Sequence, residues 1–373
     1  MQKERKAIGC QRVVVSHEGF GCGRTHQLDF RGQSGVNLAV PQALNCKIFK
    51  GRTMKCFLHA FAVIAFVFAQ TTHAQTYPNK TVRIIVPFAP GGSADGAARP
   101  VADRLGTLLG QTFLVENRPG GAATIGAAMV SKADPDGYTL LMIPGTHVLA
   151  TRMLKTVPFH PFNDFTPIAN VVFVPNFIVG DKRLPFTTMK DMVQYAKTNP
   201  GKLTIGISDV SGRIASHVVA QENGIELPSI TYKGGAPIIS DVAGGHLPLG
   251  VGSQVSVMSL YKDKRINVLG ITGPRRLPTM PEVPPIGEAL GIADFDHQTW
   301  FAIAGPANMP PAVVERLSRA IGQALADPDM RERLHSLGMI PAEDTTPTGL
   351  AALMKRHFEK NARLMDAAGI KPE

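Results

Sequence analysis

Cysteine is scarce in this chain and is confined to its beginning. Of the 373 residues, only Cys10, Cys22, Cys46 and Cys56 are cysteines, and none follows them. The rest of the chain therefore excludes structural disulfides, zinc thiolate sites and cysteine nucleophiles. A chain without cysteine suits an oxidising compartment when its core is large enough to need no disulfides.

Charged residues are also few, at 18%, and tryptophan occurs once. Hydrophobic residues make up 44%, which is enough for a core and excludes a disordered protein. A net charge of +10 would suggest a nucleic-acid partner, but most of the basic surplus precedes residue 75. The remainder is nearly balanced and has no basic stripe interleaved with aromatics, so we expect no nucleic-acid binding.

Long hydrophobic runs are absent, and a short one stands near the beginning. It covers residues 57–69, follows Met54-Lys55 and is succeeded by Thr72-His73-Ala74. A basic start, a short apolar run and a small-x-small site are typical of a secretory signal peptide, whereas a bilayer crossing needs about 20 apolar residues. We therefore predict a disordered leader or mis-assigned start at 1–53, a signal peptide at 54–74, cleavage near Ala74/Gln75 and a periplasmic location.

From residue 75 onward, short apolar runs alternate with helical patterns. This alternation predicts an α/β fold of two lobes with mostly parallel sheets, joined by a hinge of two strands. We expect one lobe to contain residues 75–178 and 297–373, and the other to contain 179–296. The predicted strands are 82–86, 113–116, 138–143, 177–179, 204–207, 229–232, 249–251, 267–272 and 299–304.

Glycine-rich turns follow several of these strands. Residues 90–95 (PGGSAD) open a helix that Ser93 or Asp95 is expected to cap. Backbone N–H groups at such a helix start bind anions readily, and ligands of open α/β sheets lie outside the carboxyl ends of the strands. Any one of these turns alone could be a purely structural tight turn. Similar turns occur at Gly120-Gly121, Gly145-Thr146-His147, 208–212 and Gly234-Gly235.

No catalytic or metal-binding pattern accompanies these turns. Their glycine spacing matches neither a dinucleotide fingerprint nor a phosphate loop. The windows around Ser93 and Ser208 lack the closing glycine of a nucleophile elbow, and the histidines after residue 75 show no H-E-x-x-H or H-x-H spacing. We expect a binding protein that is not an enzyme and has no cofactor or metal. A secreted hydrolase or isomerase that uses Ser208 or Ser93 is the alternative.

The ordered motifs of the chain resemble those of Bug-type solute receptors, the periplasmic components of tripartite tricarboxylate transporters. The resemblance extends over essentially all of the chain after residue 75. It rests on Tyr77-Pro78-x-Lys80, 84–95 (IIVPFAPGGSAD) with Ala98-Arg99, 115–120 (VENRPG), 135–141 (PDGYTLL), Gly145-Thr146-His147, 199–203 (NPGKL), Ser216-His217, 232–237 (YKGGAP), Gly244-Gly245 and 367–372 (AAGIKP).

This resemblance implies a Venus-flytrap receptor, type II-like, that closes over a small carboxylated solute. It implies that backbone amides, loop hydroxyls and waters hold the carboxylate, and that a monomer delivers the solute to a tripartite tricarboxylate-type membrane transporter. A receptor that presents its ligand to a sensor kinase is the alternative. The expected ligand-binding residues are Phe88, Gly91, Gly92, Ser93, Asp95, Thr146, His147, Ser208, Ser211, Gly212, Arg213, Tyr232, Gly234, Ala236 and Ser253.

Three departures from the family pattern bear on the ligand. Pro100 stands inside the first predicted helix, where it is expected to cause a kink. The segment 208–213 is expected to form a loop that is longer and more charged than the small, glycine-rich loop of the family, and 252–254 reads Gly-Ser-Gln instead of an Asp or Asn pair. Arg213 either faces the cleft as a bidentate partner for a second acidic group or pairs with Asp209 on the surface.

Overall fold

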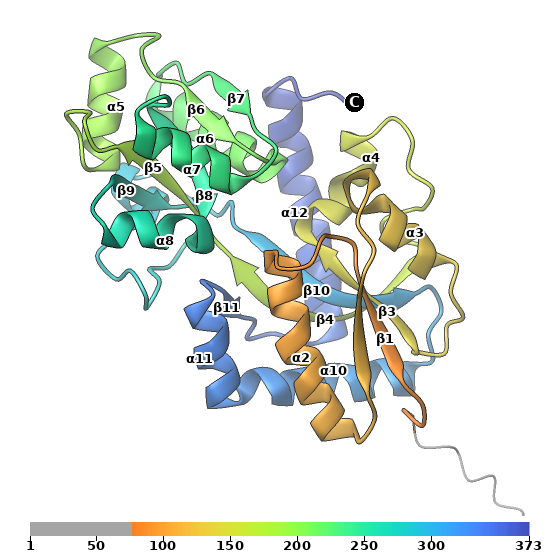
Figure 1. Ribbon diagram of the computed structural model, residues 1–373. Coiled ribbons are helices and arrows are strands. Elements are labelled where there is room, and N and C mark those ends of the chain that lie inside the picture. The colour runs from red at the N-terminus through yellow and green to blue at the C-terminus, as the bar shows by residue number, and fades with distance from the viewer. Residues whose placement is uncertain (1–76, 373) are drawn as a thin grey trace, which may run out of the picture. The chain divides into compact units, whose positions relative to one another are not determined.

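The computed structural model describes residues 77–372, which form two β-sheets flanked by helices (Figure 1). The predicted leader, signal peptide and cleavage site lie outside these residues. Within residues 77–372, no helix combines the length and the hydrophobicity that a membrane crossing requires.

The first sheet has six strands in the order β11-β4-β10-β3-β1-β2. Strands β1, β2 and β3 are parallel, whereas β10 and β4 run antiparallel to their neighbours. The strands are β1 (Val82–Val86), β2 (Phe113–Asn117), β3 (Thr139–Pro144), β4 (Phe165–Val174), β10 (Thr299–Pro306) and β11 (Ile340–Pro341). Around them lie α2 (Ser93–Leu109), η1 (Gly121–Ala123), α3 (Thr124–Ser131), η2 (Gly145–Leu149), α4 (Ala150–Met153), α10 (Pro311–Ala326), α11 (Pro328–Ser336) and α12 (Pro347–Ala367).

The second sheet has five strands in the order β7-β6-β8-β5-β9. Strands β6, β7 and β8 are parallel, and β5 is antiparallel to both β8 and β9. The strands are β5 (Asn176–Asp181), β6 (Ile205–Ile207), β7 (Ser229–Thr231), β8 (Leu249–Ser253) and β9 (Ile266–Ile271). The helices of this lobe are α5 (Met189–Thr198), α6 (Val210–Asn223), α7 (Gly235–Gly244), α8 (Gln254–Lys262) and α9 (Ile286–Leu290).

The predicted α/β fold of two lobes is confirmed, but the sheets are mixed and not mostly parallel. The antiparallel pairs involve the strands next to the crossings between the lobes, β4 and β5 on the way out and β9 and β10 on the return. Strand β5 enters the second sheet from the first lobe, and β10 enters the first sheet from the second lobe. Neither strand follows a helix that would bring it back parallel to its neighbour, so both run antiparallel.

Two crossing segments connect the sheets and bond to each other. The first passes through Pro175, between β4 and β5, so the predicted boundary between residues 178 and 179 falls inside β5. Asn176 N–H donates to Thr272 Oγ1 at 2.9 Å, and Thr272 N–H donates to the Asn176 carbonyl oxygen at 2.9 Å. His297 N–H in turn donates to the Thr272 carbonyl oxygen at 2.9 Å, which binds the return segment to the same point.

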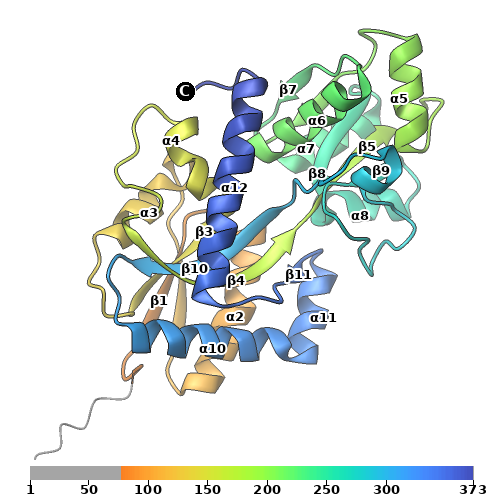
Figure 2. The same cartoon turned by 180° about the vertical axis from the view of Figure 1, so that it is seen from behind.

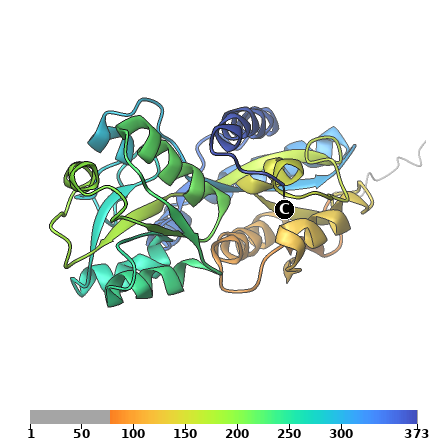
Figure 3. The same cartoon turned by 90° about the horizontal axis from the view of Figure 1, so that it is seen from above.

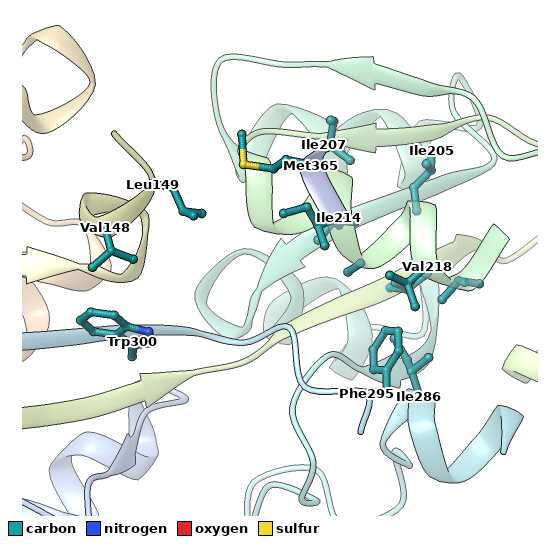
Figure 4. Close-up of a cluster of buried hydrophobic side chains, with 14 of the residues drawn as sticks. Val148, Leu149, Ile205, Ile207, Ile214, Val218, Ile286, Phe295, Trp300 and Met365 are labelled. Atoms are coloured by element: carbon teal, nitrogen blue, oxygen red, sulfur yellow. The ribbon is translucent and has the colours of Figure 1, made fainter. Parts of the chain in front are cut away.

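Buried side chains from both lobes form one apolar cluster (Figure 4). Leu149 and Trp300 contribute from the first lobe, and Ile207 and Ile214 from the second. Met365, near the end of α12, lies beside Ile207 and Ile214 (Figure 4). The last helix, which packs along β4, therefore also reaches the second lobe (Figure 2).

Candidate functional site

The β1–α2 turn presents open backbone amides at the carboxyl end of a buried strand. Gly92 is the N-cap of α2 and, within residues 77–372, no side chain accepts a hydrogen bond at this cap. The prediction that Ser93 or Asp95 caps the helix is therefore wrong, because both residues lie inside it. Gly91 has a φ of +82°, a conformation that favours glycine, and an added Cβ would meet nothing within 4 Å. The first N–H groups of α2 are thus free to bind an anion.

Asp95 holds this turn from inside and is only 5% exposed. Its carboxylate accepts hydrogen bonds from Gly91 N–H at 3.0 Å, Arg99 Nε at 2.9 Å and Asn117 Nδ2 at 3.0 Å. Burial raises the pKa of Asp95, but the bonds from Arg99, Gly91 and Asn117 outweigh it and hold the pKa below its usual range. Asp95 therefore orients the turn, and its lone pairs are already engaged.

Asn117 and Phe88 complete the support of the turn. Asn117 Nδ2 also donates to the Phe88 carbonyl oxygen at 3.0 Å, so one side chain ties the end of β2 to the loop after β1. The Phe88 ring packs edge-to-face on Phe301, with centroids 6.5 Å apart. Asn117 belongs to the family motif 115–120, but the motif alone assigns no role to this residue. Its function could not be found from sequence, because it depends on the alignment of β1 with β2.

His147, predicted as a ligand contact, has its ring in the core of the first lobe. The ring stacks on Phe159 with centroids 5.2 Å apart, and Nε2 lies 3.2 Å from the Pro161 carbonyl oxygen. Burial lowers the pKa of His147 to about 4, so the imidazole is neutral at physiological pH. This surrounding gives the ring a packing role. The adjacent Thr146 is half-buried and remains a candidate.

In the second lobe, the segment 208–213 is not a long loop. Helix α6 begins at Val210, so Ser211, Gly212 and Arg213 belong to its first turn. Asp209 is the N-cap and accepts from Gly212 N–H at 2.8 Å. Arg213 Nη2 donates instead to Thr231 Oγ1 at 3.0 Å, at the carboxyl end of β7. No ion pair between Asp209 and Arg213 is found in the described part of the chain.

The starts of α7 and α8 lie at the same edge of the second sheet. Gly234 is the N-cap of α7 and Ser253 is the N-cap of α8, and neither helix receives a capping side chain from residues 77–372. Ala236, in the first turn of α7, is exposed. The Tyr232 hydroxyl donates to Asp241 Oδ2 at 2.8 Å, and this bond raises the pKa of Tyr232. That hydroxyl therefore serves the lobe's own structure.

Gln254 brings this edge next to the first lobe. It is 4% exposed, its Nε2 donates to the Ser336 carbonyl oxygen at 3.3 Å, and its Oε1 accepts from Thr279 Oγ1 at 2.7 Å. The turn after Ser336 also reaches α2, since a Cβ added at Gly96 would lie 3.5 Å from the Met339 methyl group. The starts of α2 and α8 thus border a common turn. The view from above shows α2, in orange, on the side of the first lobe that faces the second (Figure 3).

These features point to a site for an anion. Among residues 77–372, no group of three or more His, Cys, Asp or Glu side chains could hold a metal ion. The uncapped starts of α2, α7 and α8 offer backbone donors and the positive ends of helix dipoles. Arg213 adds a guanidinium whose bond to Thr231 leaves other N–H donors available.

Comparison with known proteins identifies the family. Residues 97–370 match the model of the tripartite tricarboxylate transporter family receptor. The chain belongs to this family. A UPF0065 protein of Agrobacterium vitis is 34% identical over 302 residues, which cover 79% of this chain and 86% of that protein. The family consists of solute-binding receptors found in the periplasm, not of enzymes.

Solved structures share the architecture. A protein of R. palustris with adipate is 28% identical with a TM-score of 0.70, covering 80% of this chain and all of that one. The periplasmic binding protein BugD is 30% identical with a TM-score of 0.67 and the same coverage of both chains. The protein MatC of Rhodopseudomonas palustris, with bound malate, is 26% identical with a TM-score of 0.64, covering 78% of this chain and all of that one.

Proposed function

We propose that this receptor captures a small carboxylated solute between its lobes and delivers it to a tripartite tricarboxylate-type membrane transporter. The observation that carries the proposal is that α2, α7 and α8 begin at carboxyl ends of strands without a capping side chain in the described residues. Backbone N–H groups left unpaired at a helix start donate to an anionic oxygen at little cost. Adipate and malate in two related structures are carboxylates of the expected class.

The residues proposed to face the solute are those that the chain's own contacts leave open. In the first lobe we retain the amides of Gly92 and Ser93 together with Thr146, and in the second the small residues and hydroxyls at the helix starts. Gly91 and Gly212 donate their N–H groups to Asp95 and Asp209, and we retain them because they carry no side chain that would block a ligand. Phe88, Asp95, the His147 ring and the Tyr232 hydroxyl instead support the site. The proposed contacts are Gly91, Gly92, Ser93, Thr146, Ser208, Ser211, Gly212, Arg213, Gly234, Ala236 and Ser253.

Arg213 gives the proposal a finer form: the preferred solute has two acidic groups. One carboxylate would bind the amides at the start of α2, and the other would bind the Arg213 guanidinium, which makes no ion pair within residues 77–372. A charge-assisted hydrogen bond of this kind contributes about 1.5–3 kcal/mol. A receptor that binds its solute through backbone amides alone would not show this preference for a second acidic group.

Calorimetry with a dicarboxylate and its matched monocarboxylate tests this assignment. Thermal-shift screening first identifies a binding pair, since a ligand at a hundredfold excess over Kd adds about 2.7 kcal/mol to the free energy of unfolding. Arg213→Ala should then weaken the dicarboxylate by at least about 1.5 kcal/mol more than the monocarboxylate. An equal small loss for both ligands would remove Arg213 from the site, and no binding of any carboxylate would contradict the proposal as a whole.

Export is the remaining part of the proposal. Intact-mass analysis of periplasmic material should show a chain that begins near Gln75, and a chain that retains Met54 or Met1 would contradict the predicted signal peptide. We also propose that the receptor acts as a monomer. Adjacent genes for two membrane components would favour delivery to a transporter, whereas an adjacent histidine kinase would favour ligand presentation to a sensor.

A further inference from the structure

A cavity of about 210 Å³ lies beside the crossing segments, away from the loops that carry the proposed carboxylate site. Its apolar walls come from Phe173 on β4, Ile340 and Pro341 on β11, and Leu353 on α12. Figure 2 shows α12, β11 and β4, the elements that carry these apolar residues. None of the residues that line the cavity belongs to the turns after β1, β3, β6, β7 or β8.

Asn170 lines this cavity with a buried amide oxygen that has no hydrogen-bond partner among residues 77–372. The residue is 3% exposed, and the unpaired atom is Oδ1. Gln298, 9% exposed, lines the same cavity and leaves its Oε1 unpaired, while its Nε2 donates to Asp296 Oδ2 at 3.4 Å. Both unpaired atoms are acceptors, and buried acceptors without partners are costly, so the cavity suits an occupant that supplies hydrogen-bond donors.

Charges of both signs surround the same cavity. Arg275 Nη1 lies 3.1 Å from Glu343 Oε1, in an ion pair whose two side chains are mostly exposed. Arg356 has no salt bridge within the described residues, and its charge lowers the pKa of Asp344 after the larger effects of the hydrogen bonds from Thr346. Two guanidinium groups and two carboxylates thus balance one another, which disfavours an ion of a single sign.

We propose that this cavity is a second ligand site, and that it takes a small zwitterion such as an α-amino acid with an uncharged side chain. The ammonium of the zwitterion donates to the unpaired Asn170 Oδ1 and Gln298 Oε1, and its carboxylate binds Arg356. The side chain packs against Phe173 and Leu353. The volume is below the ~300–1,000 Å³ of pockets for drug-sized ligands, which suits a molecule of this size.

Thermal shift and calorimetry with the uncharged L-amino acids, each at millimolar concentration, test this site on the full chain. At least one should raise the melting temperature and give a measurable Kd. Asn170→Leu removes the amide while it keeps a side chain of similar size, so the variant should fold and should raise the Kd at least about tenfold. Arg356→Gln should weaken binding by a similar factor.

Two control variants separate this site from the carboxylate site. Arg363→Gln changes an exposed arginine on the same helix, and Gly92→Val blocks the β1–α2 turn; both should leave the Kd of the amino acid unchanged. The proposal is overturned if no amino acid binds at millimolar concentration, or if binding survives Asn170→Leu and disappears in Gly92→Val. Binding of a dicarboxylate, which should survive Asn170→Leu, reports on the proposed function independently.

Discussion

Gly92 shows how a single residue can leave a binding surface open. Its φ of −81° suits any residue, and a Cβ added there would meet only the Ala89 carbonyl oxygen, at 3.7 Å. A larger side chain is therefore compatible with the fold, and the proposed carboxylate contact would account for glycine at this position.

We expect Gly92→Val to fold with a melting temperature close to that of the wild type and to bind a carboxylate at least about tenfold more weakly. The isopropyl group would stand between the carboxylate and the first amides of α2, which costs the 1.5–3 kcal/mol of a charged hydrogen bond. Calorimetry measures the affinity, and Gly92→Ala should give a smaller loss. Unchanged affinity in a folded Gly92→Val protein would make the turn purely structural.

His147 should make stability depend on pH. Burial lowers its pKa from 6.5 to about 4, so between these values the unfolded chain holds a proton at His147 that the folded protein does not. The free energy of unfolding therefore falls as pH is lowered through this range, by up to about 1.4 kcal/mol per pH unit. His297 and His357 are buried in the same way and add to the effect.

Denaturant unfolding of His147→Phe between pH 6.5 and 4 measures this contribution. The substitution keeps an aromatic ring beside Phe159 and removes the titrating group, so the loss of stability with falling pH should be less steep than in the wild type. An identical slope in the two proteins would show that His147 is not neutral in the folded state.

Single residues also mark where sequence reasoning was sufficient and where it failed. Thr188 followed three residues later by Asp191 is a local signal for a helix start, and Thr188 Oγ1 does accept from Asp191 N–H at 3.2 Å at the start of α5, because a cap of this kind depends only on neighbours in the chain. Asp209 carried the same type of signal before α6, but the segment was interpreted as a loop. The burial of His147 could not be predicted, because the His147 ring contacts Phe165, which belongs to β4 and not to the η2 turn that contains His147.

At the scale of elements, α12 links the first lobe to the segment that returns from the second. Its Lys360 Nζ donates to the carbonyl oxygens of Asp294 at 2.8 Å and Asp296 at 3.1 Å. Further along the helix, Met365 enters the cluster that contains Ile207 and Ile214. The contacts of this helix with both lobes depend on residues that are far away in the sequence, so a local pattern could not have predicted them.

Lys360→Met tests the role of this ammonium while it keeps most of the side chain's length. We expect the free energy of unfolding to fall by about 1 kcal/mol, at the low end for charged hydrogen bonds because Lys360 is partly exposed. Amide hydrogen exchange around residues 294–297 should become faster. Lys355→Met, on the same helix at a side chain that is 76% exposed, is the control and should change stability by less than about 0.5 kcal/mol.

Helix α2 shows a second limit of sequence patterns. Pro100 was expected to kink it, yet the helix runs without interruption from Ser93 to Leu109, with Pro100 buried in the core. Proline removes one hydrogen bond and crowds the preceding turn, and packing on β1 and β2 maintains the helical conformation on both sides. Likewise, apolar runs predicted strands at β1–β3 and β5–β10 but not β4 or β11, and they did not predict the antiparallel direction of β5 and β10.

At the scale of the whole molecule, the sequence predicted two lobes and two crossings, since each depends on the order of elements along the chain. It did not predict the cavity beside the crossings. Asn170 lies on β4, Gln298 directly before β10 and Arg356 on α12, and only the folded arrangement brings them to one place. Their sequence surroundings contain no glycine turn or motif that would have singled them out.

The position of this cavity leads to a prediction about the whole receptor. Pro274 and Gln298, which line it, flank the segment where the chain leaves β9 and returns to β10, next to the paired Asn176 and Thr272. A ligand that bonds to this segment changes the relative free energy of the arrangements that the crossings allow. We therefore expect a saturating zwitterion to change the Kd of the carboxylate solute.

Titration in both orders measures the coupling. The factor by which the zwitterion changes the Kd of the carboxylate must equal the factor by which the carboxylate changes the Kd of the zwitterion, and couplings of this type are commonly 5- to 150-fold. Asn170→Leu should abolish the effect and leave the carboxylate affinity at its value without zwitterion. If both ligands bind the wild type and neither changes the affinity of the other, the two sites are independent and the crossing segments do not transmit occupancy between them.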